Sequence, residues 1–162
     1  MSAAERHQIS ISRWRWRRLV TELARRGRGD RESGAFLLAR TERSPRRVTA
    51  VVFFDDLDSA ALNGAISIRG EAFARLWEIC QERGMRVIAD VHTHPGAGVQ
   101  QSPTDAANPM VARSGHVAII VPRFAKGSPQ PHQIGFHVYQ GDRTWTSEYG
   151  REAATHLQRT WL

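Results

Sequence analysis

The feature that most constrains this chain is an apolar segment that runs into a histidine-rich turn at residues 85–101. Residues 85–91 are mainly apolar and predict a buried strand. His92 and His94 follow at a spacing of two, so extended backbone directs both imidazoles to one face. Pro95 cannot donate to a strand ladder and ends the strand, and the glycines after it permit a tight reversal. The sequence therefore predicts a strand that presents two imidazoles side by side where it leaves its sheet.

A short helix with an acidic first turn is predicted directly after this reversal. Ser102 suits the N-cap position and Pro103 the first helical position. Asp105 then lies in the first turn, from which its carboxylate can reach the two histidines. Two imidazoles, one carboxylate and an open position are typical of a catalytic zinc site, whereas structural zinc usually has four protein ligands. The chain has one cysteine, so we predict one catalytic Zn²⁺ bound by His92, His94 and Asp105.

The spacing of these residues resembles a known metal-binding motif. The matching pattern is His92-x-His94-Pro95, six residues, then Ser102-x-x-Asp105. It is similar to the motif of the JAMM metalloproteases, also called MPN or Mov34/PAD-1 proteins. A lone histidine is more often a surface or core residue than a ligand, but this combination is much narrower. The resemblance covers roughly residues 10–148 and implies an α/β fold of the cytidine-deaminase-like kind, with a curved mixed β-sheet flanked by helices.

The resemblance also implies an upstream glutamate, and Glu32 stands where the family carries it. Family members often have glycine three residues after this glutamate, whereas here Ala35 holds that position and Gly34 precedes it. In the implied hydrolysis of an amide bond, zinc lowers the pKa of its water, and Glu32 carries the proton to the leaving amine. The Ser102 hydroxyl can donate to the developing oxyanion. We therefore predict Glu32 and Ser102 as catalytic residues.

By the same resemblance, the substrate is the peptide or isopeptide bond after the C-terminal tail of a ubiquitin-like protein. The tail is expected to lie extended in a groove and to pair with a strand edge. The loops at 55–64 and 122–133 are expected to wall this groove. The bare domain resembles the prokaryotic branch of the family, some members of which accompany activating and conjugating enzymes in bacterial conjugation or antiphage defence. The expected partners are therefore a ubiquitin-like protein or its conjugates, with such enzymes.

Three other interpretations stay open. The first is a metalloprotease of the same fold that acts on a small sulfur-carrier protein or on an amino-acid adduct at its C-terminus. The second is a non-catalytic MPN scaffold, although such domains typically lose a ligand or the glutamate and this chain has them all. The third is nucleic-acid binding through an arginine-rich surface, as in RadC-type relatives of the fold. No helix-turn-helix or aromatic RNA-binding signature is visible, so nucleic acid is not an expected partner.

Composition agrees with a single domain over residues 1–162. This length suffices for one core, and 41% hydrophobic residues is ordinary for a globular protein. No apolar run approaches a membrane span, and the first seven residues lack the apolar core of a secretory signal. One cysteine cannot form an internal disulfide, which fits a reducing cytoplasm. We therefore expect a cytoplasmic location, and we expect no membrane partner. The formal net charge of +7 indicates either acidic partners or a solvated basic surface.

The rest of the chain is predicted to alternate strands and helices. Strands are predicted at 8–12, 36–40, 48–54, 66–68, 116–121, 134–139 and 144–148, and helices from a cap at Ser12 to about Arg26, at 70–83 and at 151–161. A turn at Ser44 and Pro45 is expected to join two of the strands, and residues 122–133 are expected to form a flexible loop.

Two predicted helices carry side chains that could have a function, a tryptophan in the first helix and the cysteine in the helix at 70–83. Trp16 lies on the apolar face of the first helix, although the arginines around it could also stack on bases or lie on a membrane. Cys80 shares an apolar stripe with Phe73, Leu76 and Trp77. We expect both Trp16 and Cys80 to pack in the core, because the periodicity accounts for them.

Overall fold

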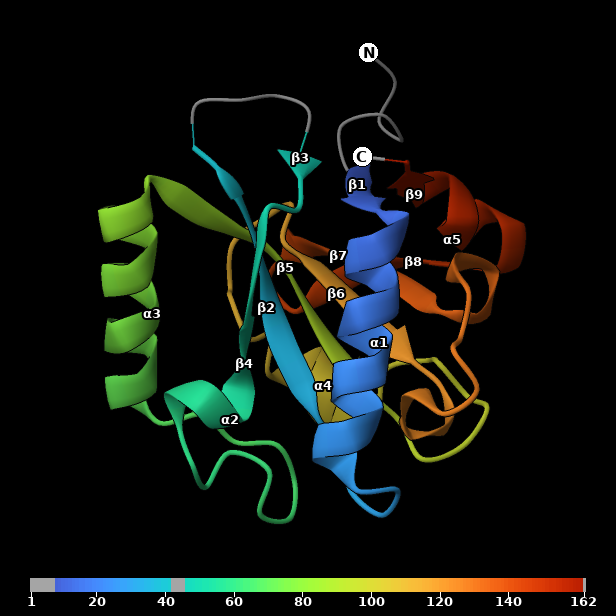
Figure 1. The fold of residues 1–162 in the computed structure, drawn as a ribbon, viewed down its shortest axis with the longest axis horizontal. Coiled ribbons are helices and arrows are strands. Elements are labelled where there is room, and N and C mark those ends of the chain that lie inside the picture. Colours follow the sequence, from blue (N-terminus) through green and yellow to red (C-terminus); the bar gives the residue numbers. More distant parts are fainter. Residues whose placement is uncertain (1–7, 42–45, 162) are drawn as a thin grey trace.

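The computed structural model describes residues 8–41 and 46–161. The strands in this part of the chain are β1 (Ile9–Ser12), β2 (Gly34–Arg40), β3 (Arg46–Arg47), β4 (Ala50–Phe53), β5 (Met85–Thr93), β6 (Val117–Val121), β7 (Gly135–Gly141), β8 (Thr144–Tyr149) and β9 (Leu157–Thr160). The helices are α1 (Arg13–Gly27), α2 (Phe54–Leu57), α3 (Gly70–Arg83), α4 (Pro103–Ala107) and α5 (Gly150–His156), with 3₁₀ turns η2 (Arg123–Ala125) and η3 (Pro131–Gln133). The fold is mixed α/β, as the sequence predicts (Figure 1).

The larger sheet has the strand order β4-β2-β5-β6-β7-β8 and is mixed. β5 pairs in parallel with β6 and antiparallel with β2, and the other neighbouring pairs are antiparallel. α3 covers one face of the sheet and α1 the other (Figure 1). For this reason β2 has no polar face: Ala35 and Leu37 join the core beside α1, while Phe36 and Leu38 join the core beside α3. The sheet is therefore buried on both sides where it carries β5 and its histidines.

α1 begins and ends close to its predicted limits. The Ser12 side chain accepts a hydrogen bond from the Arg15 amide at 3.1 Å, which is the expected N-cap. Trp16 is 2% exposed and its indole Nε1 donates to the Pro129 carbonyl at 3.0 Å, so its place in the core is confirmed. The helix ends with Arg28, not a glycine, in the left-handed region (φ 55°). α1 thus fixes the segment at 122–133, which has two 3₁₀ turns where a flexible loop was predicted.

Of the two strands predicted between β2 and α3, the first is confirmed with shorter limits and the second is wrong. The strand predicted at 48–54 is β4, which pairs antiparallel with β2 as expected but covers only Ala50–Phe53, because Phe54 begins α2. Phe54 leaves the strand because its ring packs on Phe36 with a centroid distance of 4.8 Å and is fully buried there. Residues 66–68 are not a strand, and Ile66 and Ile68 instead pack against the α3 core. The predicted turn at 44–45 lies outside the described residues.

The predicted helix at 151–161 is also wrong in its second half. α5 ends at His156, and β9 pairs in parallel with β1, with Ile9 opposite Leu157. Ile9 and Ile11 are fully buried and lie on a central strand of the smaller sheet, in the order β3-β1-β9. Leu157 is buried in the same core. Tertiary pairing with β1 therefore overrides the helical pattern of the last residues.

α3 is confirmed over residues 70–83, and Gly84 ends it in the left-handed region (φ 60°). Leu76 and Cys80 are buried as predicted, and burial raises the pKa of the Cys80 thiol. Trp77, which belongs to the same apolar stripe, is 46% exposed and so lies at the edge of this core. Among the described residues, none of the helices combines the length and apolarity needed to span a bilayer.

Candidate metal centre

β5 and its neighbours hold the two histidines of the motif side by side. His92 lies opposite Gly34 of β2 and Ile120 of β6, so ladders on both sides fix its backbone. The strand ends at Thr93, yet the His94 amide still donates to the Val121 carbonyl at 2.9 Å. His94 is therefore held beside β6 although it lies beyond the strand. The predicted strand and its exit at the histidines are both confirmed.

α4 brings the third predicted ligand to the histidines through its N-terminal cap. The Ser102 hydroxyl accepts from the Asp105 amide at 3.1 Å, and the Asp105 carboxylate accepts from the Ser102 amide at 2.9 Å. This reciprocal capping box fixes the carboxylate in the first turn. Because the Ser102 hydroxyl acts as an acceptor in the cap, its hydrogen remains available for donation. Both roles predicted for Ser102 are thus geometrically compatible.

Three ligand atoms converge on one point. His92 Nε2 lies 3.2 Å from His94 Nε2 and 3.5 Å from Asp105 Oδ2, and His94 Nε2 lies 3.2 Å from the same Oδ2. Tetrahedral zinc with bonds of about 2.0–2.1 Å needs ligand atoms separated by roughly 3.3 Å. The triangle of protein atoms matches that spacing on all three edges. The cluster is therefore able to hold a metal ion of this kind.

Polar groups on the far side of each imidazole set its orientation. His94 Nδ1 lies 3.2 Å from the Gly98 carbonyl, so Nδ1 carries the proton and Nε2 is free to ligate. His92 Nδ1 faces Asp90 Oδ2 at 4.0 Å. Asp90 is 2% exposed and its other oxygen lies 2.6 Å from His116 Nε2, also in the core. Asp90, held by His116, thus lies behind the His92 ring as a nearby negative charge rather than as a direct hydrogen-bond partner.

Electrostatics around the cluster favour a bound cation. Burial opposes the charged form of His92, but the carboxylates of Asp105 and Asp90 outweigh it and raise its pKa to about 9. Burial likewise opposes ionisation of Asp105, but the two histidines and the Ser102 amide hold its pKa well below its usual range. The pKa of Asp90 is lowered in the same way, since the hydrogen bond with His116 and the nearby imidazole of His92 outweigh its burial. The carboxylates are therefore ionised, and a metal ion can replace the proton between them.

The turn that joins the histidines to α4 rests on β7. His137 Nε2 donates to the Val99 carbonyl at 2.9 Å, and its Nδ1 lies 2.7 Å from the Ser147 hydroxyl. Burial lowers the pKa of His137, which fits a neutral ring with one donor and one acceptor. A side chain at Gly135 would overlap the Val99 carbonyl, so the turn can lie directly on the strand. No prediction from the sequence included this support.

A second support comes from a left-handed turn in the predicted substrate loop. Arg123, Phe124 and Ala125 all have positive φ, at 54°, 53° and 62°. Such conformations cost about 1–2 kcal/mol per residue outside glycine. They aim the Arg123 amide at the Gly96 carbonyl (2.9 Å) and the Phe124 amide at the His94 carbonyl (2.8 Å). The loop is thereby bonded to the histidine turn itself.

Glu32 lies next to the cluster along the β2–β5 ladder but outside the set of three ligands. Ser33 exchanges two hydrogen bonds with Thr93, each of 3.0 Å, so Glu32 precedes the residue that faces the motif. Its side chain lines an open cleft of about 620 Å³ together with Leu62, Pro95 and Phe124. Within the described part of the chain its carboxylate forms no hydrogen bond or ion pair. Its catalytic role stays a prediction.

Gly34 explains how this chain departs from the usual spacing after Glu32. A Cβ at this position would overlap the ring of Phe54 and lie 2.7 Å from the Val91 carbonyl. Glycine is therefore the only residue at position 34 that leaves room for the Phe54 ring to pack on β2. Ala35, one place later, points to the opposite core. The glycine that matters for packing here thus precedes the alanine.

Solved structures with a similar fold are distant in sequence. A protein from Desulfitobacterium hafniense has a TM-score of 0.64 and 15% identity, with 94% of each chain covered. A protein from Salinibacter ruber has a TM-score of 0.58 and 19% identity over 86% of this chain and 88% of its own. A JAB1/MPN domain protein from Archaeoglobus fulgidus has a TM-score of 0.44 and 17% identity over 88% of this chain and 94% of its own. No model of a known protein family matches the chain.

The first two similarities show that the fold recurs among bacterial proteins. Fold and site together define a mixed α/β protein with a His–His–Asp cluster that could bind a metal ion.

Proposed function

We propose that this protein is a zinc-dependent peptidase or isopeptidase of the JAMM type. The observation that carries the proposal is the triangle of His92 Nε2, His94 Nε2 and Asp105 Oδ2, with edges of 3.2, 3.2 and 3.5 Å. The side chains of His94 and Asp105 are 14% and 24% exposed. A fourth ligand from solvent or substrate can therefore reach a metal ion held there, as a catalytic site requires.

The chain's own residues supply the remaining chemistry. When bound, zinc contributes Lewis acidity and makes a water nucleophile available at neutral pH. Glu32 accepts a proton from the attacking water and passes it to the nitrogen of the leaving amine as the C–N bond breaks. The Ser102 hydroxyl donates to the substrate carbonyl oxygen as negative charge develops there. Asp90 and His116 keep the His92 ring in place during these steps.

The proposed substrate is the C-terminal tail of a ubiquitin-like protein, cleaved in deconjugation or in precursor processing. The cleft that contains Glu32 supports this proposal, because Leu62, Asn63 and Gly64 border it from one expected wall and Phe124 from the other. An extended tail can bind by pairing its backbone with such a border, which gives register without requiring a particular sequence. Associated activating and conjugating enzymes of a bacterial conjugation or antiphage system are the proposed partners.

A substrate trap tests the proposal. Glu32→Gln, loaded with zinc, should keep the metal and the fold but lose turnover, and it should retain uncleaved conjugates from cells of the source organism. Mass spectrometry of the captured material identifies the modifier. Glu82→Gln is the control, because Glu82 is an exposed acid on α3 that does not line this cleft. It should cleave normally and capture nothing.

Two results would contradict the proposal. Cleavage by Glu32→Gln at the wild-type rate would remove Glu32 from the mechanism. A wild-type protein that binds no zinc, or that loses none on Asp105→Ala, would remove the metal and with it the reaction class.

A further inference from the structure

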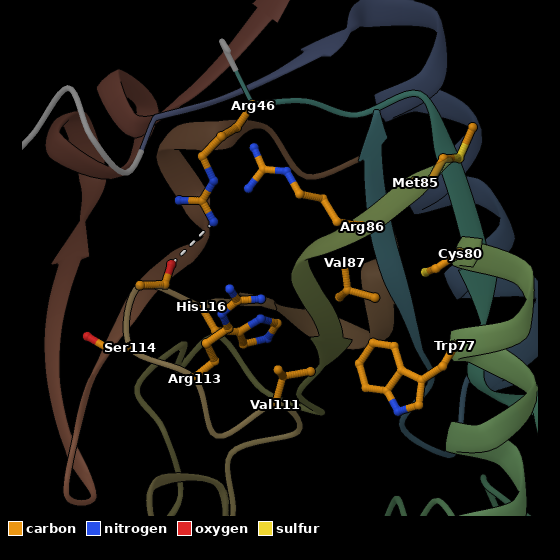
Figure 2. A pocket seen from close by; sticks show the side chains of 11 residues that line it. Arg46, Trp77, Cys80, Met85, Arg86, Val87, Val111, Arg113, Ser114 and His116 are labelled. Carbon is orange, nitrogen blue, oxygen red and sulfur yellow. Dashed lines mark hydrogen bonds between the residues drawn. The ribbon is translucent and has the colours of Figure 1, made fainter. Parts of the chain in front are cut away.

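A second cavity lies at the opposite end of β5 from the metal centre. It has a volume of about 530 Å³ and is bordered by the start of β5, by α3 and by the segment at 111–116 that leads into β6 (Figure 2). Cavities of about 300–1,000 Å³ are the usual size for small organic ligands. None of its lining residues is Glu32, Ser102 or a predicted metal ligand. His116, which hydrogen-bonds Asp90 behind His92, is the one lining residue that also belongs to the surroundings of the metal centre. The cavity is otherwise separate from the proposed peptidase site.

Three arginines make the cavity strongly cationic. Arg46 enters from β3, Arg86 from β5 and Arg113 from the segment before β6, and Arg86 extends toward Arg46 (Figure 2). Burial, together with the charge of Arg86, lowers the pKa of Arg46 to about 10. Among the described residues no carboxylate lines the cavity or forms an ion pair with any of the three. Their charge is therefore left for a ligand to neutralise.

Arg46 also has an unused hydrogen-bond donor. Its Nη2 donates to the carbonyls of Ile88 and Gly115, at 3.0 and 3.2 Å, so the side chain is held in position. Its Nε is buried and has no hydrogen-bond partner. Buried donors are nearly always satisfied, and an orphaned one is a sign of an absent group.

The opposite wall of the cavity is aromatic. Trp77 of α3 is 46% exposed, and its ring stacks on that of Phe73 with a centroid distance of 6.3 Å and an interplanar angle of 29°. Val87 and Val111 lie between this ring and the arginines (Figure 2). A rigid, exposed indole beside an apolar floor is suited to stack on a flat ring.

We propose that this cavity binds a small ligand with a phosphate group at one end and a flat aromatic ring at the other, the chemistry of a mononucleotide. The planar guanidinium groups of Arg86 and Arg113 bind the phosphate through paired N–H donors. The ring lies against Trp77. Arg46 contributes charge from a fixed position in the wall.

Calorimetric titration of the zinc-loaded protein tests this site. The probes are the four common nucleoside 5′-monophosphates, inorganic phosphate and adenosine, at low ionic strength. At least one nucleotide should bind more tightly than either phosphate or adenosine. Arg86→Ala and Arg113→Ala, both at exposed positions, should each weaken that binding about ten- to hundredfold. Trp77→Ala should weaken nucleotide binding and leave phosphate binding unchanged.

Two control variants separate this site from other sources of affinity. Arg83→Ala removes an exposed arginine from the last turn of α3 that does not line the cavity, so binding should be unchanged. Asp105→Ala should also leave nucleotide binding unchanged, which makes the result independent of the proposed metal chemistry. No binding of any nucleotide, or an equal loss in Arg83→Ala and Arg86→Ala, would overturn the proposal. Nucleotide affinity that Trp77→Ala leaves intact would overturn the stacking half of it.

Discussion

Asp90 offers the sharpest test of how the metal centre is supported. The change Asp90→Asn keeps the shape of the side chain but removes its negative charge. Asp90 is 2% exposed, one oxygen lies 2.6 Å from His116 Nε2, and the other lies 4.0 Å from His92 Nδ1. A buried hydrogen bond to a charged group contributes about 1.5–3 kcal/mol. Because asparagine can still accept a neutral hydrogen bond from His116, the free energy of unfolding should fall by only the charge-assisted part, about 1–2 kcal/mol. That lowers the melting temperature by roughly 2–8 °C in a domain of this size.

Zinc affinity should fall in the same variant although no ligand is changed. A carboxylate behind a ligating imidazole fixes its ring and increases its basicity, and losing it costs about 10- to 100-fold in metal affinity. Denaturant unfolding of the zinc-free protein measures the first effect, and competition with a chromophoric chelator measures the second. Glu82→Gln, which neutralises an exposed acid on α3, should change neither. If the Asp90→Asn protein loses stability but keeps full zinc affinity, Asp90 does not orient the His92 ring for metal binding.

Three further changes probe packing, protonation and the loop beside the cleft. Gly34→Ala should destabilise the protein by about 1–3 kcal/mol, because its methyl group would overlap the Phe54 ring; an unchanged unfolding midpoint would contradict this packing. Because the two nearby carboxylates outweigh burial and raise the pKa of His92 to about 9, protons compete with zinc below that pH, and zinc affinity should rise about tenfold per unit between pH 6 and 8. A zinc affinity that does not change between pH 6 and 8 in chelator competition would contradict this competition by protons. Hydrogen bonds from Arg69 lower the pKa of Asp58 to about 2, so their contribution is present above the unfolded pKa of about 3.9 and is lost as pH falls toward 2. Asp58→Asn should accelerate amide exchange in residues 58–69 at neutral pH, and equal exchange in both proteins would mean that the pair does not hold the loop.

Short-range patterns predicted the metal cluster well. The spacing of His92 and His94 depends on the two-residue period of a strand, and the orientation of the Asp105 carboxylate depends on a cap that Ser102 and Pro103 make locally. These preferences agree with the tertiary fold, so the predicted ligands converge. The strand and helix limits failed where distant packing decided the outcome, at Phe54 and at the start of β9.

Asp90 and His116 were missed for a similar reason. Asp90 stands two residues before His92, and the alternation Asp90-x-His92-x-His94 was a readable sign that it shares their face. The partner of Asp90 could not be predicted from the sequence, because His116 lies 26 residues away and contacts Asp90 only through the pairing of β5 with β6. The Ser147 hydroxyl behind His137 likewise depends on the register between β7 and β8.

The smaller sheet makes the order of synthesis differ from the order of assembly. A ribosome releases β1 early, but its partner β9 emerges only after nearly all of the remaining described chain. Ile9 and Ile11 are fully buried in the finished protein, in a core that they share with residues of α1 and with Leu157 of β9, so their burial is complete only after β9 has been made. β1 thus gains one neighbour, β3, early and the other, β9, only when almost all of the described chain has been made, so the smaller sheet is completed after every strand of the larger one has been synthesised.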